Sequence, residues 1–177
     1  MNRRGFLAAG IVATLGGCSA PDIDAFRSER PVLDLRRYFD GIVDAWGIVR
    51  DRDGTISQRF TVEIRATWQG DVGTLDESFR YSDGRTQRRV WTIRKQADRY
   101  RGTAADVVGE ATGEAAGNAI RFRYTLDYPY GGTTVPLAVD DWMFLVDETV
   151  LLNRSSIAKF GVEVAQVFIS FRRRGGP

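Results

Sequence analysis

The chain has few of the side chains that usually carry out enzymatic chemistry. It contains no histidine and a single cysteine, Cys18, among 177 residues. These absences exclude Ser-His-Asp and Cys-His nucleophilic pairs, zinc sites built from His and Cys, and a disulfide within the chain. We therefore predict a protein that is not an enzyme and that has no metal and no other cofactor. A carboxylate-dependent hydrolase is the weakest of the functions that stay open.

Glu77 and Arg89 form the clearest candidate pair for a polar site inside a fold. Glu77 interrupts an otherwise apolar strand face, which is made by Leu75, Phe79 and Tyr81. A buried carboxylate is costly unless it is paired. A three-residue hairpin loop over 82–84 places Glu77 opposite Arg89 and beside Trp91. The pair is either a polar spot in a ligand cavity or a buried ion pair that fixes the register of the strands.

Aromatic side chains could complete such a cavity. The candidate ligand-binding residues are Glu77, Arg89, Trp91, Tyr124 and Trp142. For the aromatic members, the alternative is packing in the core. Asp140 and Asp141 are adjacent on a predicted strand and point to opposite faces, so they cannot both act on one substrate. One of them lines the mouth of the fold, or both belong to a turn.

The only cysteine closes a segment with the layout of an export signal. Arg3 and Arg4 make its start basic, residues 6–15 are apolar, and two glycines precede Cys18. The apolar run is shorter than the roughly 20 residues that span a bilayer. The Leu-Gly-Gly-Cys ending resembles the lipobox of bacterial lipoproteins, in which the cysteine is lipidated and becomes the first mature residue. The alternatives are an ordinary signal peptide with a chance cysteine, or a buried N-terminal helix.

The lipobox resemblance implies a signal peptide over residues 1–17 and a membrane anchor of acyl chains on Cys18. It places the protein in the cell envelope, facing the periplasm. In enterobacterial lipoprotein sorting, an Asp directly after the cysteine favours the inner membrane. The chain has Ser19 at this position, which by analogy favours the outer membrane. Arg3 and Arg4 also resemble a twin-arginine export motif, so both export routes stay open.

The candidate site residues lie on segments with period-two alternation, which is typical of strands with one buried face. Strands are predicted over 45–51, 60–68, 75–81, 86–95, 98–108, 110–116, 120–126, 140–146, 149–153 and 161–172. Asp-Gly and Gly-Asn pairs between them are hairpin signals. The pattern predicts an all-β fold, a single antiparallel lipocalin- or calycin-like barrel of about 8–10 strands.

The barrel domain is expected over residues 34–173 and begins with a short helical turn near 34–38. Residues 18–33 carry two prolines and mixed charges, and we predict that they form a lipidated tether. Without residues 1–17 the chain holds 23 basic and 23 acidic residues. Since phosphate binding needs an excess of positive charge, we expect no nucleic acid partner.

Several runs occur together and in order over about residues 34–172. They include Tyr38-Phe39-Asp40-Gly41, Ala45-Trp46-Gly47, residues 75–84 and Asp140-Asp141-Trp142-Met143. Through them the chain resembles a family of uncharacterised bacterial lipoproteins with a lipocalin-like domain of unknown function. The resemblance implies a calycin-type barrel in an envelope lipoprotein and no activity.

Two functions therefore stand ahead of the hydrolase. The first is an envelope-anchored lipoprotein that binds or carries a small hydrophobic or amphipathic ligand in its barrel. The second is a structural or interaction lipoprotein whose barrel is filled by side chains. The sequence leaves the ligand, the partner and the oligomeric state open.

Overall fold

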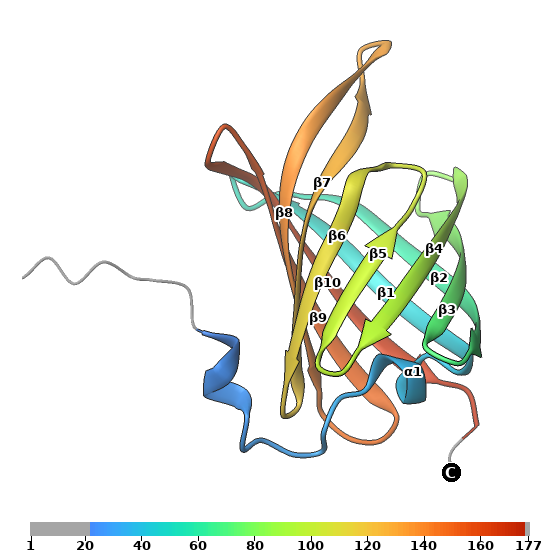
Figure 1. Ribbon diagram of the computed structural model, residues 1–177. Helices are drawn as coiled ribbons and strands as arrows, with labels where there is room; N and C mark the ends of the chain where they lie inside the picture. The colour runs from blue at the N-terminus through green and yellow to red at the C-terminus, as the bar shows by residue number, and fades with distance from the viewer. Residues whose placement is uncertain (1–21, 176–177) are drawn as a thin grey trace, which may run out of the picture.

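Ten antiparallel strands close into one barrel (Figure 1). The computed structural model describes residues 22–175. Two short helices, η1 (Ile23–Phe26) and α1 (Leu35–Tyr38), precede the strands. The strands are β1 (Gly41–Asp51), β2 (Ile56–Gln69), β3 (Val72–Tyr81), β4 (Thr86–Gln96), β5 (Arg99–Thr103), β6 (Val107–Ala116), β7 (Ala119–Tyr130), β8 (Thr133–Leu145), β9 (Val150–Lys159) and β10 (Val162–Arg173). Each strand pairs with its neighbours in the sequence, and β1 closes the barrel on β10. The predicted all-β barrel is confirmed.

Period-two alternation determines which side chains fill the barrel. On β2, Phe60, Val62, Ile64 and Ala66 are buried, while the residues between them are exposed or only partly buried. The same alternation on the other strands points one row of side chains from each strand into a common core. Closure gives each of the ten strands a pairing partner on both sides, which limits pairing with other chains.

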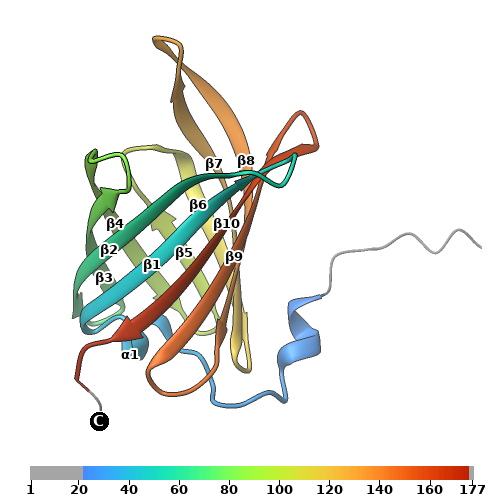
Figure 2. The same cartoon turned by 180° about the vertical axis from the view of Figure 1, so that it is seen from behind.

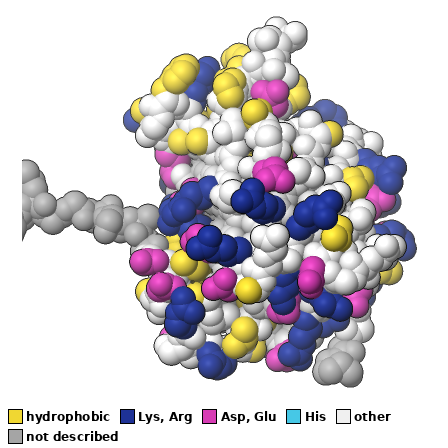
Figure 3. Space-filling model, in the orientation of Figure 1, with side chains coloured by type: hydrophobic (Ala, Val, Ile, Leu, Met, Phe, Trp, Pro, Cys, Tyr) yellow, Lys and Arg dark blue, Asp and Glu magenta, His cyan; other side chains and the backbone are white. Residues whose placement is uncertain are grey.

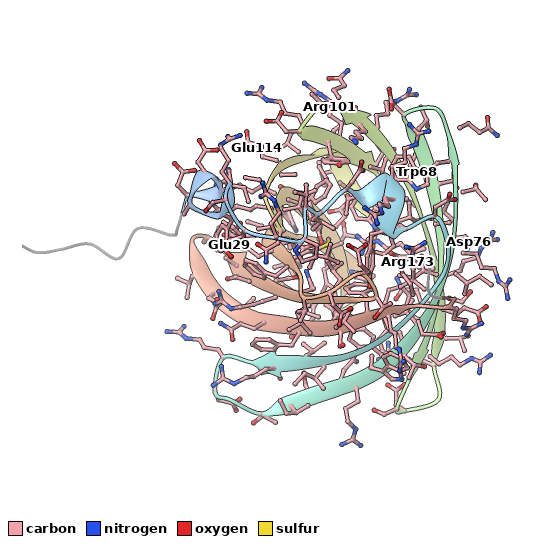
Figure 4. All side chains as sticks on the ribbon, turned by 90° about the horizontal axis from the view of Figure 1, so that it is seen from below. Glu29, Trp68, Asp76, Arg101, Glu114 and Arg173 are labelled. Carbon is pink, nitrogen blue, oxygen red and sulfur yellow. The ribbon has the colours of Figure 1, made fainter. Side chains whose placement is uncertain are left out.

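One end of the barrel is closed by α1 and the residues around it. Leu35, Tyr38 and Phe39 are buried in the main core. The Tyr38 hydroxyl donates to the Thr149 backbone oxygen at 2.9 Å, and the Trp68 indole donates to the Phe39 backbone oxygen at 3.3 Å. Viewed from this end, side chains crowd the interior and Trp68 lies beside α1 (Figure 4). The α1 end is therefore a packed plug.

Residues 22–32 lie outside the barrel, and Leu33 enters its main core. Ile23 is buried against the outer wall, and the Leu33 backbone N–H donates to the Gly117 oxygen at 2.8 Å. The Phe26 ring lies 5.3 Å from the Phe144 ring. These contacts correct the predicted tether over this part of residues 18–33, because apolar side chains in a mostly polar stretch bind it to the wall. The predicted signal peptide and Cys18 lie outside the described residues.

The other end of the barrel is more open. The β7–β8 and β9–β10 hairpins extend beyond the remaining strands there (Figures 1 and 2). Inward-facing Ile64 and Leu151 are at most 1% exposed, as in a filled core. In contrast, inward-facing Phe79, Tyr124 and Val167 are only partly buried. Solvent therefore reaches the interior of the barrel from the end opposite α1.

Candidate functional site

A charged and aromatic cluster lies inside the barrel on β3, β4 and β7. Glu77 and Arg89 are directly opposite each other, as the hairpin loop over residues 82–84 predicts. The loop has this form because Gly84 adopts a φ of +88°, and the Asp83 carboxylate accepts the Arg85 backbone N–H at 3.0 Å. The predicted register is thereby confirmed, and it turns both side chains of the pair inward.

Arg89 is the centre of this cluster. Its Nε donates to Asp106 Oδ1 at 3.0 Å, and its guanidinium lies over the Trp91 ring at 4.6 Å from the centroid. Its Nη2 is buried and has no hydrogen-bond partner among the described residues. Tyr124 meets the Trp91 ring edge-on, with 5.6 Å between the centroids. We call Glu77, Arg89, Trp91, Asp106 and Tyr124 the Arg89 cluster.

A second buried polar group on β8 and β9 lies near the Arg89 cluster. The Ser155 hydroxyl donates to Asp141 Oδ1 at 2.9 Å, and the Asn153 amide donates to the same oxygen. The Asn153 amide also donates to the Trp142 backbone oxygen at 3.0 Å. Asp140 points to the other face of β8, where it accepts the Arg121 Nε at 2.6 Å. Asp141 is thus the only acid of this adjacent pair that faces the interior.

Burial controls the protonation of these carboxyl groups. It raises the pKa of Glu77 to about 7, and the nearby Arg89 charge opposes the rise only in part. Burial also raises the pKa of Asp141, against the hydrogen bonds from Asn153 and Ser155. Burial alone would lower the pKa of Arg89, but Tyr124, Glu77 and Asp106 raise it overall, so the guanidinium stays charged. The charge of Arg89 therefore acts on two carboxyl groups, Glu77 and Asp141, that burial makes easier to protonate.

The structure brings together Glu77, Arg89, Trp91 and Tyr124 but not Trp142. Alternation on β8 turns Trp142 outward, because Asp141 next to it faces inward. Its ring stacks on Phe144 at 5.8 Å and lies beside Phe26 of η1. The expected place of Trp142 in an interior site is thus corrected. Its role is to hold η1 on the wall.

Sequence reasoning did not place Asp106, Asn153 or Ser155 in this site. Asp106 lies in the β5–β6 connection and reaches Arg89 only because the sheet curves into a barrel. Asn153 and Ser155 carried a usable signal, because polar residues two positions apart on an apolar strand must share one face. That signal needs the register between β8 and β9 before it points to Asp141.

A hollow of about 790 Å³ lies on a different part of the molecule. It is bordered by residues of β3, β2, β1, β10 and β9, which are consecutive around the barrel, and by Ser82 next to β3. Alternation turns Trp46 and Phe168 outward, since Ala45 and Ile169 beside them face the core. An interior cavity would also be lined by the opposite wall, β4 to β8, but no residue of that wall lines this hollow. The hollow therefore belongs to the outer surface and is separate from the Arg89 cluster.

Residues 22–175 hold no group of three or more metal-ligating side chains in reach of a common ion. In the same residues, no helix has the length and apolar character needed to cross a bilayer.

One family of known proteins matches most of the chain. Residues 12–173 match the family described as protein of unknown function (DUF3833). The chain belongs to the DUF3833 family. No curated protein matches this DUF3833 member. The match agrees with the predicted membership of a family of unknown function.

Solved structures share the fold of this DUF3833 protein. The S-type phycobiliprotein lyase CPES from Guillardia theta aligns with a TM-score of 0.59 and 8% identity, over 89% of this chain and 100% of that one. A protein of unknown function from the DUF3598 family of Nostoc punctiforme aligns with a TM-score of 0.57 and 12% identity, over 82% of this chain and 51% of that one. At such low identities the likeness shows the barrel fold alone.

Proposed function

We propose that this protein binds a small amphipathic molecule in the open end of its barrel, without catalysing a reaction. The observation that carries the proposal is the buried Arg89 Nη2, which has no partner among the described residues. A buried donor without an acceptor costs free energy, and a polar ligand group beside it would remove that cost. Arg89 would thus orient the polar end of the ligand.

The wall around Arg89 suits the apolar part of such a ligand. Trp91 and Tyr124 present aromatic surface next to the guanidinium, and Phe79 and Val167 lie on the other strands of the interior. All four are only partly buried, so a ligand that covers them removes apolar surface from water. Small-molecule sites commonly combine an apolar wall with a few polar groups that fix orientation.

The fold of the solved neighbours is compatible with this proposal but does not specify the ligand. One neighbour is named a phycobiliprotein lyase, and at 8% identity its activity does not carry over to this chain. The competing proposal, a barrel filled by side chains, accounts for the packed α1 end. It does not account for partly exposed aromatic side chains inside the other end.

The proposal places the barrel on a membrane. Cys18 would carry acyl chains, residues 1–17 would be removed, and the mature protein would lie in the cell envelope, at the outer membrane. The Leu-Gly-Gly-Cys run after a basic and apolar segment supports this anchor. Ligand binding and anchoring are separate claims, and each has its own test.

Ligand binding is tested by native mass spectrometry of the protein purified from its own envelope, and by titration with the amphipathic dye anilinonaphthalene sulfonate. We expect a retained mass and saturable dye fluorescence for the wild type, and the loss of both in Arg89→Gln. The matched control is Arg88→Gln, since Arg88 is the next residue on β4 and pairs on the outside with Asp76 at 2.6 Å. Equal dye binding by the two variants, with circular dichroism showing both folded, would refute a site at Arg89.

A further inference from the structure

The outer hollow presents an apolar surface that the barrel fold does not need. Trp46 is 50% exposed and Leu152 is 46% exposed, although both could be polar without any loss to the core. Ile48 and Phe168 are partly buried in the next row along the strands, where Ile48 pairs with Phe168 across β1 and β10. Clustered apolar side chains on an outer face are typical of an interaction site, whereas isolated ones are not.

The charges at the border of this hollow have one sign. Arg59 and Arg80 line it, and none of its lining residues is acidic. Within residues 22–175 neither arginine has a carboxylate within 4.0 Å. On the face shown in Figure 3, in contrast, basic and acidic side chains intermingle. Elsewhere on the barrel, Arg101 pairs with Glu110 at 2.8 Å. The hollow is thus complementary to an apolar surface that carries negative charge.

We propose that this surface, the Trp46 face (Trp46, Ile48, Leu152 and Phe168 with Arg59 and Arg80), docks on an anionic lipid bilayer. Trp favours the boundary between headgroups and acyl chains, and a basic side chain near an anionic bilayer is attracted to it. A second copy of the chain fits less well. A symmetric contact through this face would bring Arg59 and Arg80 near the same arginines of the other copy.

The position of the N-terminal segment supports a bilayer at this face. Leu152 pairs with Phe144 across β9 and β8, and Phe144 contacts Phe26 of η1. The apolar surface therefore continues from the hollow to η1. The stretch from Cys18 to Asp22 spans at most about 14 Å when fully extended. This step rests on the proposed lipidation, because a lipidated Cys18 would hold the bilayer close to η1. The charge argument does not rest on it.

The test is quenching of Trp fluorescence by brominated acyl chains, with the full protein as purified. We expect quenching on vesicles that contain phosphatidylglycerol, and less on vesicles of phosphatidylcholine alone. Trp46→Phe should remove the quenched component, since Trp68 and Trp91 face the barrel interior and Trp142 is buried beneath Phe26 of η1. The double variant Arg59→Gln/Arg80→Gln should partition about fivefold more weakly for each arginine removed. The matched control, Arg88→Gln/Arg101→Gln, changes two arginines outside the Trp46 face and should behave as the wild type.

Vesicle flotation separates attachment from docking. If the protein floats with anionic vesicles but Trp46 is not quenched, an anchor holds it and the proposed face is wrong. If it does not float, the proposal also fails, because the Trp46 face should bind by itself. A dimer that Trp46→Phe dissociates, without quenching by lipid, would assign the face to a second copy and overturn the proposal.

Discussion

Glu77 on β3 and Arg89 on β4 face each other across the barrel wall, and both side chains point inward. The ion pair of Arg89 is nevertheless with Asp106, to which its Nε donates, and not with Glu77, while its Nη2 remains without a partner in the described residues. The guanidinium is therefore bonded to Asp106, and its charge also acts on Glu77 and Asp141. The predicted Glu77–Arg89 ion pair is thus replaced by an Arg89–Asp106 pair beside Glu77, which leaves one donor of Arg89 free.

Removal of Arg89 should destabilise the barrel strongly. In Arg89→Met the carboxyl groups of Glu77 and Asp106 lose their cation while they stay partly or fully buried. Breaking a buried pair in this way costs about 3–5 kcal/mol of unfolding free energy. Urea unfolding at pH 7 measures the loss. Arg88→Met, on the outside of the same strand, should cost no more than about 1 kcal/mol. Similar losses in the two variants would show that Arg89 is not a buried partner.

Stability should fall as pH rises from about 4.5 to about 7. The pKa of Glu77 is about 7 in the folded protein against an ordinary value of 4.5. Between these values the folded chain holds a proton that the unfolded chain releases. The proton on Glu77 therefore stabilises the fold fully below about pH 4.5, and this stabilisation is lost as the pH rises through about 7. The loss of unfolding free energy over this pH range is on the order of 3 kcal/mol.

Urea unfolding across this pH range provides the check. Glu77→Gln should reduce the slope, because the amide does not titrate, and the raised pKa of Asp141 should leave a residual slope of the same sign. Asp76→Asn should leave the slope in place, since the Arg88 hydrogen bonds hold the pKa of Asp76 below its ordinary value and outside this range. A wild type whose stability rises over the same range would contradict a protonated Glu77.

The part of the fold that local chemistry determines could be predicted from the sequence. Alternation and hairpin signals indicated all ten strands, and the Asp83-Gly84 turn fixed Glu77 opposite Arg89. The inward or outward phase of β8 could not be predicted, because Asp140 and Trp142 alternate with Asp141 and Met143 and both rows contain apolar and acidic residues. Tertiary packing decides that phase, since Phe26 covers the row that holds Trp142.

Gly117 should control whether residues 22–33 stay on the barrel wall. Its φ is +54°, and a Cβ there would lie 1.8 Å from the Phe26 backbone oxygen. We expect Gly117→Ala to displace η1, with faster hydrogen exchange at residues 23–33 and little change inside the barrel. Gly84→Ala is the matched control, because its φ is +88° and no atom lies within 4 Å of the added carbon. It should add only the backbone strain of a left-handed alanine, about 1–2 kcal/mol. Equal exchange of residues 23–33 in both variants would mean that this contact does not hold the segment.

Cys18 should be the first residue of the mature protein and should carry acyl chains. Intact mass spectrometry of the protein from its own membranes should give the mass of residues 18–177 with the mass of the lipid added. Cys18→Ser should retain residues 1–17, because the proposed cleavage between Gly17 and Cys18 would require the lipidated cysteine. Cys18→Ala serves as a second variant that excludes an effect of the serine hydroxyl.

If either variant is cleaved normally and the wild type carries no lipid mass that the variant lacks, then an ordinary signal peptide precedes the barrel and the cysteine is incidental. Flotation of these variants would then report on the Trp46 face alone, because no lipid would contribute to attachment.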